Sequence, residues 1–63
     1  MNHYPIGTLV KHRHFHGRTL GIVKSVITSY TKVLMVVSWF SSLEETMDEM
    51  WELISIEEID NDE

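Results

Sequence analysis

Cysteine is absent from this 63-residue chain, and proline and glycine are scarce, at one and three residues. Without cysteine there is neither a disulfide framework nor a thiolate zinc site, two supports on which many small domains depend. The longest uncharged run covers 11 residues, 33–43, which is about half of what a membrane span needs. We therefore expect a soluble chain that relies on a dense apolar core and has no membrane partner.

Signatures of catalysis are missing as well. The chain has no glycine-rich phosphate loop, nucleophile elbow or metalloprotease motif. The adjacent carboxylate pairs Glu44–Glu45 and Glu57–Glu58 would diverge on a strand or helix instead of flanking a substrate. So short a chain also leaves little room for a concave pocket. We expect a protein that is not an enzyme, has no cofactor and takes no small-molecule substrate.

Charge of each sign is confined to one part of the chain. All five Lys and Arg residues and all four His lie between His3 and Lys32, whereas all ten Asp and Glu lie between Glu44 and Glu63. The net charge of −5 therefore averages a basic N-terminal part and an acidic C-terminus. This split predicts either that the two parts neutralise each other in the fold or that opposite ends meet different partners.

The residues that are present predict a folded, mainly β domain. Hydrophobic residues make up 43% of the chain and charged residues 24%, a composition typical of globular proteins. One domain, 1–63, is expected, with a core of about 6–59 and frayed ends at 1–4 and 60–63.

Three strands are expected in the first 40 positions, because β-branched and alternating residues fill 8–15, 19–28 and 31–40. Gly17 suits the turn between the first two. Gly21 marks a bulge or a close backbone approach within the second strand.

The segment 42–52 allows two interpretations. Ser42 and Glu45 match a helix capping box, and apolar residues recur at helical spacing after them, which favours a short helix. The competing interpretation is a fourth strand over 46–53, which a neighbouring hairpin architecture would require. A further single turn is expected near 55–58, with Ile59 in a short closing strand.

Four largely apolar segments and two isoleucines follow one another along the chain: Ile6–Val10, Leu20–Val26, Val33–Phe40, Trp51–Ile54, Ile56 and Ile59. Their order resembles that of small SH3-like (Tudor- or KOW-like) barrels, in particular short uncharacterised barrels of tailed bacteriophages. The resemblance implies an all-β or mainly β antiparallel barrel of four to five strands, with one short helix near 42–52 as an option. It also implies a viral protein of the host cytoplasm or the virion.

The last strand of such a barrel commonly lies beside the first. That arrangement would place Glu57, Glu58 and Asp60 near Lys11 and Arg13. The charge split would then reflect mainly an internal pairing of the chain ends.

An apolar surface is the leading candidate site. The segment 33–40 is apolar on both faces, and a small barrel has one interior, so one face needs a cover from this chain or another. We expect a non-catalytic protein-interaction or structural module that binds a protein partner or a second copy. The predicted contact residues are Phe15, Leu34, Val36, Trp39, Phe40 and Trp51.

Two further functions remain open. A nucleic-acid-associated barrel would use the basic residues Lys11, Arg13, Arg18 and Lys24, interleaved with aromatic residues. An acidic C-terminus would suit a phage antagonist of a basic host protein.

Alternating histidines form the last candidate. His12, His14 and His16 would share one face of an extended strand, about 6–7 Å apart. They could hold a metal ion if a further ligand converged on them. We expect solvated residues and no metal.

Overall fold

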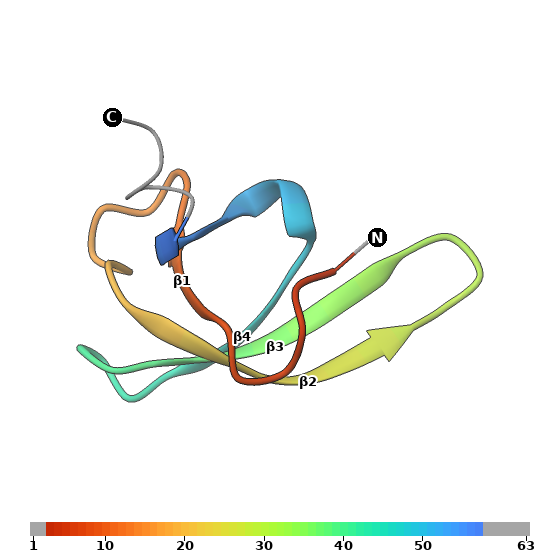
Figure 1. Ribbon diagram of the computed structural model, residues 1–63, viewed down its shortest axis with the longest axis horizontal. Coiled ribbons are helices and arrows are strands. Elements are labelled where there is room, and N and C mark those ends of the chain that lie inside the picture. Colours follow the sequence, from red (N-terminus) through yellow and green to blue (C-terminus); the bar gives the residue numbers. More distant parts are fainter. Residues whose placement is uncertain (1–2, 58–63) are drawn as a thin grey trace.

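The computed structural model describes residues 3–57 and shows one five-stranded antiparallel sheet in the order β4-β3-β2-β1-β5 (Figure 1). This all-β architecture confirms the predicted fold class and is compatible with a small β-barrel. The elements are β1 (Leu9–His12), β2 (Gly21–Thr28), β3 (Val33–Trp39), β4 (Glu45–Asp48), the 3-10 turn η1 (Met50–Glu52) and β5 (Leu53–Ser55).

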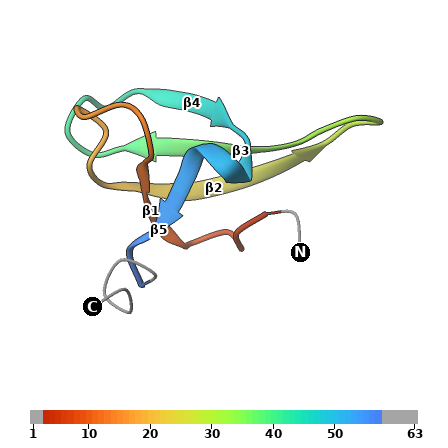
Figure 2. The ribbon, with the colours of Figure 1, turned by 90° about the horizontal axis from the view of Figure 1, so that it is seen from above.

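The last strand lies beside the first, as expected. Val10 pairs with Ser55 and His12 with Leu53 in the antiparallel β1–β5 ladder. Figure 2 shows β4, β3 and β2 as one curved layer that β1 and β5 cross. The β2–β3 hairpin extends beyond the other strands as an arm (Figure 1).

The core forms on the inner face of this curved sheet. Along β3, Met35, Val37 and Trp39 are fully buried and alternate with half-buried neighbours, which is the period of two expected of a strand with one inner face. Val10, Val23 and Leu53 complete the buried cluster. The core therefore draws on β1, β2, β3 and β5 together.

Gly21 of β2 lies opposite Trp39 of β3, where the two strands pack closely. A Cβ built there would lie 2.7 Å from Cε3 of Trp39 and 2.8 Å from Cγ1 of Val37. The predicted close backbone approach is therefore confirmed, and the missing side chain leaves room for the Trp39 ring beside β2. The bulge of β2 lies elsewhere, at the register shift between Val23 and Ser25.

Of the two interpretations of 42–52, the structure adopts the strand, followed by the single 3-10 turn η1. Leu43 adopts a positive φ of 59° in a turn, and β4 then pairs along β3, with Val36 opposite Met47. Without β4, the backbone edge of β3 would be unpaired, so the tertiary requirement overrides the local helix signal. A capping box does form, but seven positions later, between Glu49 and Glu52 at η1.

The first strand is shorter than the predicted 8–15. β1 ends at His12, short of 15, because the chain turns there. Near the N-terminus, Tyr4 packs against the core and its backbone N–H lies 3.2 Å from Sδ of Met35. The closing strand predicted at Ile59 lies outside the described residues. Across 3–57, no helix is long and apolar enough to cross a membrane.

Candidate functional site

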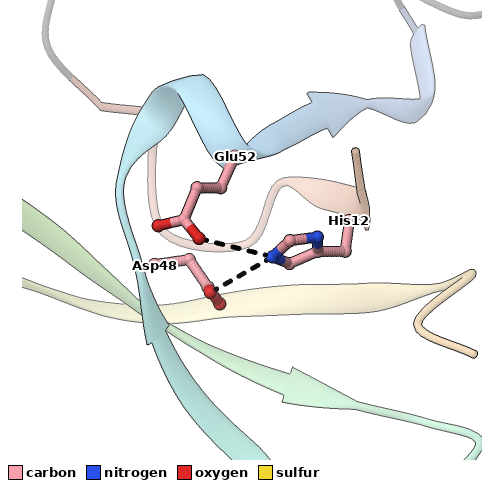
Figure 3. Close-up of side chains that lie close together, drawn as sticks. All are labelled: His12, Asp48 and Glu52. Carbon is pink, nitrogen blue, oxygen red and sulfur yellow. Dashed lines mark ion pairs between the residues drawn. The ribbon is translucent and has the colours of Figure 1, made fainter. Parts of the chain in front are cut away.

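His12 is a buried histidine that faces two carboxylates. Its side chain is 2% exposed, and Nε2 lies 3.5 Å from Oδ1 of Asp48 and 3.5 Å from Oε1 of Glu52 (Figure 3). Both distances exceed those of ordinary hydrogen bonds, and Nε2 makes no bond of standard geometry. The contact is therefore an electrostatic one that the two carboxylates share.

The other ring nitrogen determines the tautomer. Nδ1 of His12 accepts the backbone N–H groups of His14 at 3.0 Å and Phe15 at 3.1 Å. An atom that accepts two N–H groups offers a lone pair and has no hydrogen of its own. The neutral ring therefore has its hydrogen on Nε2, where it points at Asp48 and Glu52. The same two bonds turn the chain after His12 and end β1.

Asp48 continues the network into the core. Its side chain is 6% exposed, and Oδ2 accepts the hydroxyl of Thr46 at 2.5 Å. That hydroxyl oxygen in turn accepts Nε1–H of Trp39 at 2.7 Å. Trp39 Nε1, the Thr46 hydroxyl and Asp48 Oδ2 thus each have a hydrogen-bond partner, which is what burial of polar groups requires.

Glu52 connects the network to η1. One carboxylate oxygen, Oε2, accepts the backbone N–H of Glu49 at 3.0 Å, while the other faces His12. We call His12, Asp48 and Glu52 the clasp. It joins β1 to β4 and η1, and β1 and β4 are not neighbours in the sheet.

The clasp has the residue types of a metal site, since its three possible ligand atoms lie within 4.8 Å of one another. A histidine that binds a metal through Nε2 has its hydrogen on Nδ1 and donates it to an acceptor. Here Nδ1 faces two donors, so Nε2 has no lone pair to offer. The clasp therefore does not fit a metal centre.

The three alternating histidines stay near one another: the ring centroids of His12 and His14 lie 6.2 Å apart, and all three residues line one pocket. The His14 ring lies 6.0 Å from the Trp51 ring and His16 is exposed in the loop. The alternation predicted for a strand does not continue past His12, because β1 ends there.

The predicted partner-binding residues fall into three places. Trp39 lies in the core. Leu34 and Val36 lie on the outer face of β3. Phe15, Phe40 and Trp51 are exposed on the β1–β2 loop, at the end of β3 and on η1.

Apolar side chains from three strands meet on the outer face of the sheet. Leu34 pairs with Ile27 of β2, and Val36 pairs with Met47 of β4; directly opposed residues project to the same face. Ile27 and Met47 are 44% and 60% exposed, so the described part of the chain leaves this face open. We call these four residues the outer-sheet patch.

The basic residues named for nucleic-acid binding do not lie together as a group of four. Lys11, Arg13 and Arg18 belong to β1 and the loop after it, and they line one pocket. Lys24 lies on β2, where its Nζ is 2.7 Å from Oε2 of Glu45.

Residues of the basic and acidic parts of the chain do pair within the fold. The acidic residues in these pairs differ from those predicted. The acidic partners found are Glu44, Glu45 and the two clasp carboxylates. Of the terminal carboxylates predicted to pair, Glu57 has no basic partner among the ion pairs of the described residues, and Glu58 and Asp60 lie outside that range.

Comparison with known proteins adds no relative: no family model matches the chain, and neither a curated protein nor a solved structure is significantly similar to it.

Proposed function

We propose that this chain is a non-catalytic protein-interaction module, built as an SH3-like barrel of a bacteriophage and working through the outer-sheet patch. The observation that carries the proposal is the apolar, uncovered outer face of β2, β3 and β4. The pairing of β5 with β1 and the resemblance of the strand segments support the barrel type.

The outer-sheet patch is unusual for a sheet face in water. Antiparallel sheets with one solvated face normally alternate apolar and polar residues, but β3 presents Leu34 and Val36 outward as well as Met35 and Val37 inward. Contiguous exposed apolar surface on a small domain marks an interaction site. Met47 adds a flexible side chain that adapts to differently shaped partners.

A different protein fits this patch better than a second copy. Each copy has a net charge of −5, and repulsion between two molecules with net charge of the same sign opposes self-association. The rim of the patch offers both Lys24 and Glu45, which form an exposed ion pair and can re-pair with a partner's polar groups. The partner we propose presents an apolar anchor inside a neutral or basic surface.

The test compares Ile27→Glu and Met47→Glu with the matched control Leu43→Glu, whose site is 87% exposed in the β3–β4 turn, outside the patch. Each tagged variant is used to capture proteins from infected host cells, and circular dichroism checks its fold. A protein retained by the natural chain and the control, but lost with both patch variants, supports the proposal.

Two results would contradict the proposal. One is an identical set of retained proteins for all variants. The other is a sedimentation profile that shows a dimer, which Met47→Glu converts to monomer, because the patch would then serve self-association.

A further inference from the structure

A second surface, which is basic, lies around the end of β1 and the β1–β2 loop. There a pocket of about 180 Å³ is lined by Lys11, Arg13, His14, His16 and Arg18, together with uncharged residues and the buried clasp imidazole. A pocket of this volume has room for one phosphate group. No carboxylate lines this pocket among residues 3–57.

Several contacts hold the loop that carries these cations. The backbone N–H groups of His14 and Phe15 bind Nδ1 of His12, and the backbone N–H of Arg18 binds the carbonyl of Phe15 at 3.1 Å. From the β3–β4 turn, Oγ of Ser41 donates to the carbonyl of Gly17 at 3.1 Å. The loop is therefore ordered before any ligand arrives, which lowers the entropic cost of binding.

The two guanidinium groups are also oriented. Nε of Arg13 donates to the carbonyl of Trp51 at 2.9 Å, which leaves the terminal nitrogens of that group for a ligand. The guanidinium carbon of Arg18 lies 4.4 Å from the centre of the Phe15 ring. Guanidinium groups held in this way suit phosphate, because their planar donors match two of its oxygens at once.

The carboxylates near the pocket compete little with a phosphate for its cations. Glu44 lies 3.7 Å from Arg18, but its side chain is 60% exposed, and such surface pairs contribute little. Asp48 and Glu52 face Nε2 of His12, whereas the loop binds Nδ1 on the other edge of that ring. Repulsion from the more distant carboxylates is screened beyond about 8–10 Å at physiological salt.

We propose that this basic pocket binds a backbone phosphate of single-stranded nucleic acid. A nucleic acid is favoured because Phe15 and Trp51, 57% and 58% exposed, flank the cations and offer aromatic surface to the bases beside the phosphate. Basic grooves interleaved with aromatic rings bind single strands without strong sequence preference. The outer-sheet patch shares no residue with this pocket, so the two proposals stand or fall separately.

The experiment measures binding of a labelled oligodeoxythymidine by fluorescence anisotropy between about 20 and 200 mM salt. Arg13→Gln and Arg18→Gln are compared with Lys32→Gln, which removes an exposed charge from the tip of the β2–β3 arm. Each pocket variant should weaken binding about tenfold and reduce the slope of log affinity against log salt by about 0.7. Lys32→Gln should leave the affinity nearly unchanged.

Because Arg13 donates a hydrogen bond to the η1 backbone, thermal melting checks that Arg13→Gln is still folded. Arg18→Gln tests the same pocket without the loss of that bond. Phe15→Leu should weaken binding at unchanged salt slope, since it removes aromatic surface and no charge, while Tyr30→Leu at the arm tip is its control.

Three results would overturn the proposal. They are no binding at low salt, equal binding by both pocket variants and the natural chain, and binding of a serine-phosphorylated peptide under conditions where the oligonucleotide does not bind. The last result would assign the pocket to a phosphorylated protein.

Discussion

Replacement of His12 by asparagine separates the two roles of its ring. The Oδ1 of an asparagine at this position can still accept the N–H groups two and three residues on, as Asx turns do, so the turn that ends β1 should persist. The shorter side chain cannot reach Asp48 and Glu52. His12→Asn should therefore remove the clasp while keeping the local turn.

The expected loss follows from the contacts of the ring. A full hydrogen bond to a charged group contributes about 1.5–3 kcal/mol. The two contacts of Nε2, at 3.5 Å each, are longer and singly weaker than such a bond, and we expect about 1.5 kcal/mol from both together. The ring also has an edge contact with Phe15 at 5.0 Å, and such aromatic contacts contribute about 0.5–1.5 kcal/mol. The two together give about 2–3 kcal/mol.

A loss of this size is large for so small a domain. A chain of 63 residues has a free energy of unfolding of about 3–9 kcal/mol, and each kcal/mol lowers the Tm of a domain of this size by about 4–8 °C. His12→Asn should therefore lower the Tm by about 10–20 °C, measured by far-ultraviolet circular dichroism. The control His16→Asn, in the exposed loop, should change stability by less than about 0.5 kcal/mol.

A double-mutant cycle gives the refuting result. If the clasp is real, His12→Asn and Asp48→Asn share a lost interaction, so their combined effect should fall short of the sum by about 1 kcal/mol. Additive effects would show that the two side chains act independently. A His12→Asn protein as stable as His16→Asn would refute the clasp altogether.

Two further substitutions probe the packing around Trp39. Gly21→Ala should destabilise the fold by about 1–3 kcal/mol, because the added Cβ would lie 2.7 Å from the Trp39 ring; a urea titration followed by tryptophan fluorescence measures it, and an unchanged midpoint would contradict the close approach. Thr46→Val keeps the side-chain shape but removes the hydroxyl between Trp39 and Asp48, and should cost about 1–3 kcal/mol, whereas a loss below about 0.5 kcal/mol would show that this bridge does not stabilise the fold.

The sequence predicted the features of the fold that depend on local residue preference. The β-branched segments located β2 and β3 to within a few residues, and Gly21 indicated a close approach because only a missing side chain lets two strands come that near. The fourth strand was left open because its local pattern has helical spacing, and its strand form is determined by pairing with β3. Pairing of that kind is a property of the assembled sheet.

The clasp could not be predicted for a related reason. His12 was considered with His14 and His16 because alternation places such residues on one face of a strand. The His12 ring itself ends the strand, by binding the two following backbone N–H groups, and so breaks the pattern that suggested the grouping. No spacing along the chain connects His12 to Asp48 or Glu52, which come from β4 and η1.

The clasp explains part of the division of charge along the sequence. A buried imidazole from the basic part meets two carboxylates from the acidic part, so the charge split helps to bring β4 and η1 onto β1. The remaining cations of the β1–β2 loop line a pocket that has no carboxylate among the described residues. One division of charge thus helps to join β1 with β4 and η1 and leaves a separate basic surface. The His12→Asn and Arg18→Gln variants should therefore affect stability and anion binding independently.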